Sequence, residues 1–205
     1  VIYRDGYYYL FLAYGSLSVE YNTRVCRSRN IDGPYVDIHG NSAMGSAQLY
    51  PILTAPYRFD NSYGWVGISH CGIFDDGAGN WFYTSQGRFP VNVGGNEYSN
   101  AIMMGHVRSI RWDANGWPLV MPERYGAVPQ APITENEIAG DWEHLALTNS
   151  TGTQRTSETM TYDLDTHKIT SGSWKNATWT FDAATQTITT SAGVVLYLQR
   201  EVDWE

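Results

Sequence analysis

His70 is the residue of this chain whose type and surroundings most favour chemistry. An imidazole nitrogen can bind a metal ion or accept a proton near neutral pH. Its neighbours Ser69 and Gly72 are small, so a ligand or an ion could approach the ring closely. A single histidine in a strand is more often a packed or surface residue. Two interpretations therefore stand side by side, an ion ligand and an ordinary structural side chain.

His106 is the rival candidate for an ion ligand. It alternates within the apolar run from Ile102 to Ile110. Its neighbours Met104, Val107 and Arg108 offer none of the oxygen-rich surroundings that hard cations require. We therefore expect His106 to pack in the interior.

A group of polar and aromatic residues surrounds one loop between two predicted strands. Asn22 could hydrogen-bond hydroxyl groups, and Tyr14 or Tyr21 could stack on a flat ring. Each could equally complete a strand and its turn, and Arg24 could be a structural ion-pair residue. The group consists of Tyr14, Ser16, Tyr21, Asn22 and Arg24.

The acidic residues form no evident catalytic pair. Most of them lie in predicted turns, where aspartate supports the local backbone. The residues considered are Asp5, Glu20, Asp32, Asp37, Asp75, Asp76 and Glu97.

Predicted strands position the polar and aromatic group around Asn22. Asp5-Gly6 separates two β-prone runs, residues 1–4 and 7–14, and is a strong hairpin signal. A third run, residues 21–28, follows a loop of small residues. Three strands in a meander make most of one propeller blade.

His70 lies in a second predicted hairpin. Residues 64–74 are predicted as one strand, a Gly/Asp/Asn cluster as the turn, and residues 81–88 as the return strand. Gln86 and Arg88 stand at the entrance of the long polar loop 89–100, which a compact domain would use for binding. Strands over 101–112 and 117–120 follow. The turn-rich segment 37–61 is predicted only to lead into this region.

A proline-containing segment, residues 122–138, marks a predicted boundary between domains at 1–130 and 138–205. The second domain is rich in Thr and Ser and alternates with a period of two. Trp174 and Trp179 could form a carbohydrate platform, but we expect them to pack in the core. Six short strands in so few residues predict a small antiparallel barrel. They are residues 142–147, 157–164, 168–171, 177–181, 187–190 and 194–199.

Composition excludes some classes of partner. A net charge of -8 leaves no basic patch for nucleic acid or an anionic membrane. No apolar run approaches the ~20 residues that span a bilayer. The 15 Tyr and 8 Trp permit stacking on sugar rings as well as packing. Cys26 and Cys71 do not make a disulfide framework, and their pairing is open.

Two stretches resemble the arabinanases of glycoside hydrolase family 43. Residues 67–74 followed by 81–88 are similar to that family's Gly-x-Gly-His-Asn-Ser-Val-Phe hairpin, with Ser69 in place of a glycine and Cys71-Gly72 in place of Asn-Ser. Gly-Tyr-Tyr-Tyr-Leu-Phe at 6–11, Tyr-Asn-x-Arg-Val-x-Arg-Ser at 21–28 and Ile-x-Gly-Pro-Tyr-Val-Asp at 31–37 resemble its third blade. The C-terminal part resembles the accessory β-barrel of two-domain arabinanases.

The resemblance implies an all-β chain that forms the later blades of a five-bladed β-propeller followed by a small antiparallel β-barrel. It implies that His70 faces the central channel and binds calcium, or another ion such as sodium. Because imidazole is an unusual ligand for calcium, several waters would complete the site. Tyr14, Ser16, Tyr21, Asn22 and Gln86 would border the cleft that binds the sugar.

The resemblance also implies hydrolysis of α-1,5-linked L-arabinofuranosyl bonds in arabinan with inversion, which needs two carboxyl groups roughly 6.5 to 9.5 Å apart. In the family a Glu-Ala-Pro motif and two earlier Asp supply them, so no catalytic residue is expected in this chain. The alternatives are a non-catalytic carbohydrate-binding propeller and a family 43 enzyme acting on xylan or on arabinose side chains.

The start of the chain at Val1-Ile2-Tyr3, without methionine, suggests a piece of a longer protein or of a two-piece enzyme. Its expected partner is then the N-terminal propeller segment as a second chain. No signal peptide is evident, and an extracellular bacterial location is implied by the resemblance alone.

Overall fold

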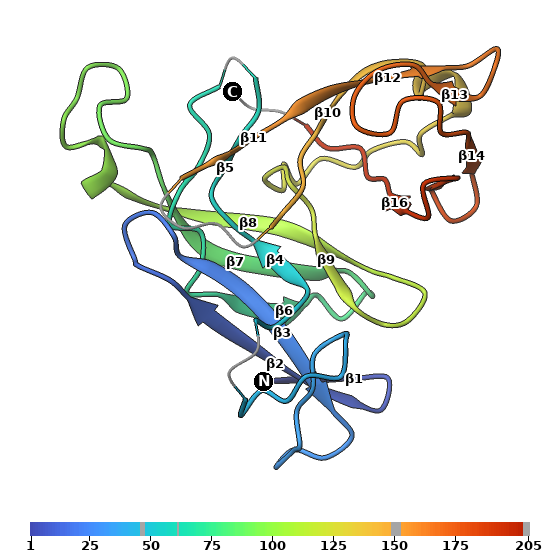
Figure 1. Cartoon of the computed structure of the whole chain (residues 1–205). Coiled ribbons are helices and arrows are strands. Elements are labelled where there is room, and N and C mark those ends of the chain that lie inside the picture. Colours follow the sequence, from blue (N-terminus) through green and yellow to red (C-terminus); the bar gives the residue numbers. More distant parts are fainter. Residues whose placement is uncertain (46–47, 61, 149–152, 203–205) are drawn as a thin grey trace. The chain divides into compact units, whose positions relative to one another are not determined.

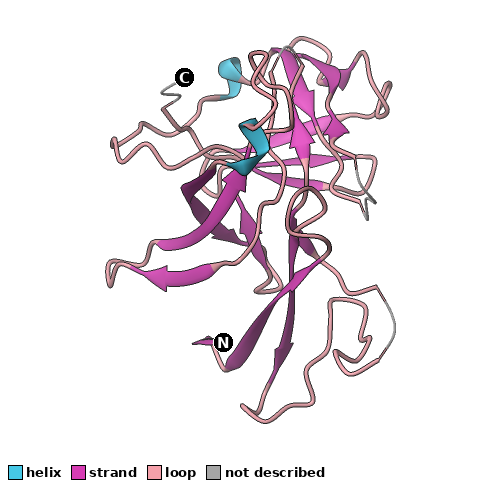
Figure 2. Cartoon of the chain, turned by 90° about the vertical axis from the view of Figure 1, so that its left-hand side faces the viewer, coloured by secondary structure: helices cyan, strands magenta, loops and turns pink. Residues whose placement is uncertain are grey.

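The computed structural model describes residues 1–45, 48–60, 62–148 and 153–202. Its regular elements are strands apart from two short 3-10 helices (Figure 2). By their internal contacts the residues form two compact units, Val1–Pro122 with Leu147–Arg155, and Glu123–Ala146 with Thr156–Glu205. The return of Arg155 to the first unit is a feature that the sequence patterns did not indicate.

The first unit contains two four-stranded antiparallel sheets among the described residues (Figure 1). Each sheet is a meander whose strands are neighbours in chain order, which is the architecture of a propeller blade. The first sheet comprises β1 (Ile2–Arg4), β2 (Tyr7–Tyr14), β3 (Asn22–Ser28) and β4 (Ile52–Thr54). The second comprises β6 (Gly72–Asp75), β7 (Trp81–Arg88), β8 (Met103–Trp112) and β9 (Pro118–Val120).

Two smaller elements complete the first unit. The 3-10 helix η1 (Ser99–Ala101) lies in the loop between β7 and β8. The short strand β5 (Tyr57–Arg58) is paired with β11 (Arg155–Thr156), and the N–H of Arg155 donates to the carbonyl of Pro56 at 2.9 Å. This pairing is how the late segment rejoins the first unit.

The predicted hairpin at Asp5-Gly6 is confirmed. Asp5 and Gly6 have φ angles of 48° and 82°, the left-handed geometry of a two-residue turn whose twist matches that of its strands. Tyr9 and Val25, on neighbouring strands, are completely buried with Leu53 and Trp117 in one core cluster. The turn therefore fixes the register that places this sheet's apolar face inward.

Two strand predictions were wrong in this unit. Ile52–Thr54, expected only to lead into the next blade, is the buried fourth strand of the first sheet. Residues 64–74, expected as one strand, are interrupted. Trp65 and Val66 form isolated bridges, and β6 begins only at Gly72, because Gly67 and His70 adopt φ angles of 63° and 60° that a strand cannot contain.

The six strands predicted for the second unit are all present, together with η2 (Glu135–Glu137). In the described residues they form two three-stranded sheets, joined by a bridge between Lys168 and Thr178, where one continuous barrel was expected. The first sheet comprises β10 (Gly140–His144), β12 (Glu158–Asp163) and β13 (Lys168–Ile169). The second comprises β14 (Trp179–Asp182), β15 (Thr187–Thr190) and β16 (Val195–Tyr197).

Trp174 and Trp179 of the second unit pack against its core, as expected. Trp179 is 1% exposed at the centre of a core with Ile138, Met160 and Ile169. Trp174 is half-buried against the same cluster. Trp179 is therefore a core residue, and Trp174 packs against that core with part of its surface exposed.

Glu137 links η2 to the C-terminal segment of the second unit. Its carboxylate accepts hydrogen bonds from the backbone N–H and the hydroxyl of Thr134, both at 2.8 Å, and from the guanidinium of Arg200 at 2.6 Å. These bonds, first among them that from the Thr134 N–H, lower the pKa of Glu137 from 4.5 to about 2.

We expect this carboxylate to contribute a pH-dependent part of stability. Because the pKa of Glu137 is lower in the folded than in the unfolded state, its stabilisation is complete above about pH 4.5 and is lost as the pH falls towards 2. Glu137→Gln should lower the denaturation midpoint at pH 7. It should also reduce the loss of stability that the wild-type protein shows between pH 5 and 2.5. Glu97→Gln, at an exposed glutamate of the first unit, is the control. Identical acid profiles for wild type and Glu137→Gln would contradict the assignment.

Candidate functional site

Three loops of the first unit meet at one end of the two blades. They are the β2–β3 loop (residues 15–21), the segment 66–71 before β6, and the β7–β8 loop (residues 89–102). The N–H of Gly67 donates to the carbonyl of Val19 at 2.9 Å, and the side-chain amide of Asn100 donates to the carbonyl of Ser18 at 2.9 Å. Loops from both blades therefore form one surface, which is the candidate functional site.

Gly67 is required for this convergence. A Cβ atom at this position would lie 2.8 Å from the carbonyl oxygen of Leu17, and the residue has a φ of 63°. Glycine alone allows both the close approach and the left-handed backbone without strain.

His70 is exposed at this site, so its ring is accessible. Its φ of 60° lies in the left-handed region, which histidine enters more often than most residues but still at a cost. Non-glycine residues in such conformations gather at functional sites, where the surrounding structure holds them. The location of His70 is therefore consistent with an ion ligand and excludes burial in a packed core.

A network of buried hydroxyl groups holds the backbone immediately before His70. The hydroxyl of Thr23 lies 2.8 Å from that of Ser69 and 2.7 Å from that of Tyr83. The hydroxyl of Ser69 donates to the carbonyl of Asn22 at 3.1 Å. Thr54 donates to the carbonyl of Ile68 at 2.7 Å. Strands β3, β4 and β7, from both blades, thus jointly position residues 68 and 69.

Burial of this network changes the ionisation of its members. Desolvation raises the pKa of Tyr83 to about 12, so its hydroxyl stays protonated and available as a donor at neutral pH. Desolvation also raises the pKa of the Cys71 thiol. Cys26, completely buried in β3, has a pKa raised to about 11 by the same cause. Both cysteines are free thiols in the structure.

Thr23→Val tests the network. The change keeps the side-chain shape and removes a hydroxyl bonded to two others, so Ser69 and Tyr83 each lose a buried partner. We expect a loss of about 1–3 kcal/mol in the free energy of unfolding. The matched control is Thr84→Val, where a less buried hydroxyl donates to the carbonyl of Gly72. Chemical denaturation that gives equal losses for the two variants would contradict the role of the network.

The structure brings together three of the polar residues predicted around the β2–β3 loop. The side-chain amide of Asn22 donates to the carbonyls of Tyr14 and Glu20, and its oxygen accepts from Arg24. The guanidinium of Arg24 lies 4.7 Å from the centre of the Tyr14 ring. Asn22 is only 7% exposed, so its polar atoms hold the loop from within.

The other predicted residues border the site in different ways. Ser16 is exposed, and its N–H donates to Glu20 at 3.4 Å. Tyr21 is half-buried between the loop and β3. The amide of Gln86, also half-buried, donates to the carbonyl of Gly67 at 3.2 Å. Gln86 is therefore tied directly to the segment that carries His70.

His106 packs in the interior, as predicted. It is 2% exposed, its ring meets that of Trp65 edge-on at 4.3 Å, and Nδ1 lies 3.3 Å from Arg108. Arg108 is itself buried and also donates to the carbonyl of Pro122. A Cβ at Gly87 would lie 2.5 Å from the His106 ring, so the glycine makes room for it.

Asp37 and Asp76 serve turns, as predicted for most of the acidic residues. The carboxylate of Asp76 accepts from the N–H groups of Ala78 and Asn80, and that of Asp37 from those of His39, Asn41 and Tyr50. Among the described residues, no three His, Cys, Asp or Glu side chains cluster as a metal site would require.

Sequence reasoning missed Thr23, Thr54, Tyr83 and Asn100. The three network hydroxyls lie on strands separated by up to 60 residues, and no local pattern distinguishes them from other strand residues. Asn100 stood within the predicted binding loop, but its bond across to Ser18 could not be read from spacing.

Two family models match the chain. A family model described as glycosyl hydrolases family 43 matches residues 1–118, and one described as a C-terminal lipocalin-like domain matches residues 122–205.

In the described part of the chain, no helix has the length and hydropathy to cross a membrane.

Two curated relatives carry names that specify an activity. An extracellular endo-α-(1→5)-L-arabinanase 2 of Bacillus subtilis is 29% identical over 157 residues, 67% of this chain and 32% of its own. An extracellular endo-α-(1→5)-L-arabinanase of Thermotoga petrophila is 30% identical over 156 residues, 68% of this chain and 32% of its own. The chain thus spans about a third of the length of these relatives.

Solved structures confirm the predicted fold class. The endo-1,5-α-L-arabinanase of Thermotoga petrophila superposes with a TM-score of 0.75 at 24% identity, over 90% of this chain and 42% of its own. A glycoside hydrolase family 43 protein of Bacillus licheniformis superposes with a TM-score of 0.73 at 25% identity, over 91% of this chain and 44% of its own. Both the blades and the second β unit are therefore parts of a known architecture.

Proposed function

The chain belongs to the glycosyl hydrolases of family 43, and from this premise we propose that it is part of an enzyme that hydrolyses α-1,5-linked L-arabinofuranosyl bonds in arabinan. The observation that carries the proposal is the exposed His70, held in a left-handed conformation where loops of two blades meet. The names of the two curated relatives supply the substrate.

The proposed chemistry is hydrolysis with inversion by a pair of carboxyl groups on opposite sides of the sugar. The acidic residues whose hydrogen bonds were described above are occupied in turns. We propose, as the family resemblance implies, that the general acid, the general base and the third carboxylate lie on other blades of the propeller. The described loops would border the cleft, with Tyr14, Ser16, Tyr21, Asn22 and Gln86 lining or supporting its edge.

His70 would hold an ion, calcium or another such as sodium, through one ring nitrogen, with waters as the remaining ligands. A bound cation would supply a positive field that favours the ionised form of carboxylates and waters around it. The contribution of this chain is positional, because the hydroxyl network fixes residues 68 and 69 and so fixes where the imidazole stands.

The proposal includes a partner and a location. The missing blades would come from an N-terminal propeller segment, either of the same polypeptide or as a second chain. The extracellular names of the relatives support secretion of the enzyme. Intact mass analysis of the protein purified from its source distinguishes the two arrangements, since a second chain appears as a separate mass that copurifies.

Product analysis tests the activity. The complete enzyme is incubated with linear arabinan and with xylan, and the products are separated by chromatography. We expect arabino-oligosaccharides from arabinan alone, and proton NMR of the first products should show the inverted anomer. Release of xylose from xylan would favour a different family 43 enzyme. Binding of arabinan without any cleavage would favour a carbohydrate-binding propeller, and either result overturns the proposal.

A further inference from the structure

A cavity lies at the opposite end of the first blade from the candidate functional site. It has a volume of about 500 Å³ and is bordered by the start of β2, the end of β3, the loop after β3 and the β8–β9 turn. Tyr7 is the first residue of β2 and borders the cavity. Tyr14 is the last residue of β2 and lies beside the candidate site. At ~3.4 Å per residue the seven steps between them span roughly 24 Å. The cavity is thus separate from the site proposed for hydrolysis.

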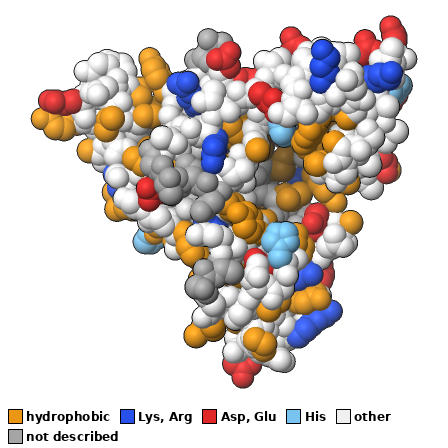
Figure 3. All heavy atoms as spheres, viewed as in Figure 1, with side chains coloured by type: hydrophobic (Ala, Val, Ile, Leu, Met, Phe, Trp, Pro, Cys, Tyr) orange, Lys and Arg blue, Asp and Glu red, His pale blue; other side chains and the backbone are white. Residues whose placement is uncertain are grey.

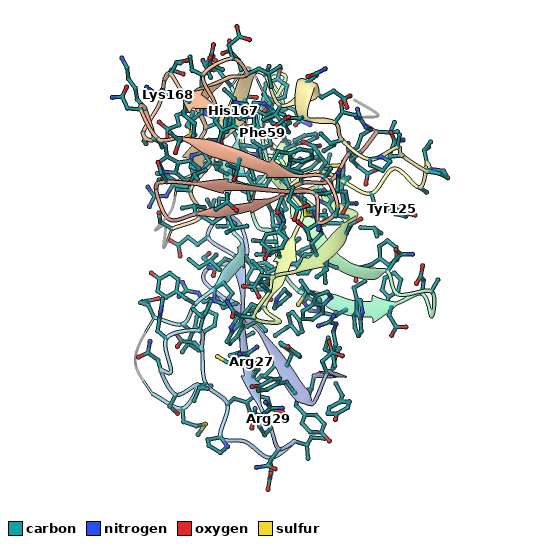
Figure 4. The ribbon with its side chains drawn as sticks, turned by 90° about the vertical axis from the view of Figure 1, so that its right-hand side faces the viewer. Arg27, Arg29, Phe59, Tyr125, His167 and Lys168 are labelled. Atoms are coloured by element: carbon teal, nitrogen blue, oxygen red, sulfur yellow. The ribbon has the colours of Figure 1, made fainter. Side chains whose placement is uncertain are left out.

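Two arginines define the chemistry of this cavity. The guanidinium of Arg27 lies 4.3 Å from the centre of the Tyr7 ring and 4.2 Å from that of Trp117, and Arg29 lies 3.7 Å from the Tyr7 ring. Figure 4 shows the two side chains at the same end of the first sheet. Stacking on aromatic faces holds each planar group in a defined orientation.

Both guanidiniums keep donors for a ligand. Each carries five N–H groups. Arg27 donates to the carbonyl of Asn115 at 2.7 Å and Arg29 to the carbonyl of Gly6 at 3.3 Å. Among the ion pairs of the described residues, neither arginine is matched with a carboxylate. Two oriented forks that lack an acidic partner are a suitable receptor for a carboxylate.

Asp37 is the acidic residue of the cavity wall, and its charge is already satisfied. It is 2% exposed, and its carboxylate accepts hydrogen bonds from His39, Asn41 and Tyr50. In a protein with a net charge of -8, two arginines on one cavity are a local excess of positive charge. Figure 3 shows Lys and Arg side chains to be sparse over most of the face that it displays.

The rest of the lining suits a sugar ring better than an inorganic anion. Pro34, Val36 and Ile38 supply apolar surface, and Ser28 and Asn30 supply hydrogen-bonding groups. A volume of about 500 Å³ lies in the range of cavities that bind small organic ligands. We propose that this cavity binds a carboxylate-bearing sugar unit, such as a uronic acid residue of an acidic polysaccharide, through the guanidiniums of Arg27 and Arg29.

Titration calorimetry with trigalacturonic acid at low salt tests the proposal. We expect binding by the wild-type protein, and at least about tenfold weaker binding by Arg29→Gln, because a charge-assisted hydrogen bond is lost. Arg29 is exposed, so the variant should fold normally. Arg29→Lys keeps the charge but not the fork, and should bind with intermediate affinity. Lys175→Gln, which removes the same charge from an exposed site of the second unit, should bind like wild type.

Three ligand controls separate a sugar acid site from other anion sites. Methyl-esterified trigalacturonate and arabinotriose, which are neutral, should bind at least tenfold more weakly than trigalacturonic acid. Inorganic phosphate should bind more weakly as well. The proposal is overturned if phosphate matches the sugar acid, if the neutral ester matches it, or if Arg29→Gln and Lys175→Gln behave alike. None of these readouts depends on arabinan hydrolysis, so the two proposals succeed or fail separately.

Discussion

Replacing His70 by alanine should reduce the turnover of arabinan by the complete enzyme about 100-fold, while leaving the thermal midpoint nearly unchanged. The activity falls because the imidazole is the proposed ligand of the ion, and loss of groups that hold or orient an ion costs about 10- to 100-fold. Stability is spared because His70 is exposed, and its ring covers no core.

The backbone at this position calls for a second variant. Alanine is less favourable than histidine at a φ of 60°, whereas glycine enters the left-handed region without strain and has no side chain that could bind an ion. His70→Gly therefore removes the imidazole and allows the left-handed conformation. If both variants lose activity equally, the imidazole is responsible. If only the alanine variant does, the backbone is responsible and the ligand assignment fails.

The control for both variants is His39→Ala. His39 is also exposed, but it lies in the loop after β3, at the opposite end of the blade. Its replacement should leave turnover unchanged. Calorimetric titration with calcium provides a readout other than activity, since the wild-type enzyme should bind the ion more tightly than either His70 variant. Equal calcium affinity in all proteins would remove the proposed role of His70.

Trp179→Ala should destabilise the second unit by about 3–5 kcal/mol, the range for deleting a large buried aromatic side chain. Trp179 is 1% exposed and contacts the rings of Tyr162 and His167, at 6.0 and 4.6 Å between centroids. Domains have a free energy of unfolding of only about 5–15 kcal/mol, so this loss would leave the second unit with little stability. Fluorescence or calorimetric unfolding should show the transition of the second unit shifted to lower temperature or denaturant concentration.

Trp142→Ala is the matched control for that loss. Trp142 belongs to the same unit but is 38% exposed, with one hydrogen bond from its indole to the carbonyl of Ile138. We expect a loss of about 1 kcal/mol. Trp179→Phe should lie between the two because the ring is retained. Similar losses for Trp179→Ala and Trp142→Ala would show that the core is not organised around Trp179.

The strands could be predicted because their signals are local. Asp5-Gly6 forces a turn at one position, and the two-residue alternation of the second unit marked all six of its strands. The family resemblance of residues 6–11 and 67–74 likewise depends on short, contiguous motifs. Predictions failed where conformation depends on distant contacts. The break at His70 and the pairing of Ile52–Thr54 with β3 follow from neighbours outside those segments.

By itself, the amino-acid sequence determined the all-β class and the strands of the blade meanders, because side-chain alternation and turn residues act over a few positions. The preference for His70 over His106 came from the family resemblance and from the oxygen-poor neighbours of His106. Only the tertiary structure decided that His70 stands exposed in a left-handed conformation, and that Thr23, Thr54, Ser69 and Tyr83 hold the backbone before it. It alone brought Arg27 and Arg29 together with Tyr7 and Trp117. Such groupings join residues far apart in the chain, and their position is set by how sheets pack, which no local pattern encodes.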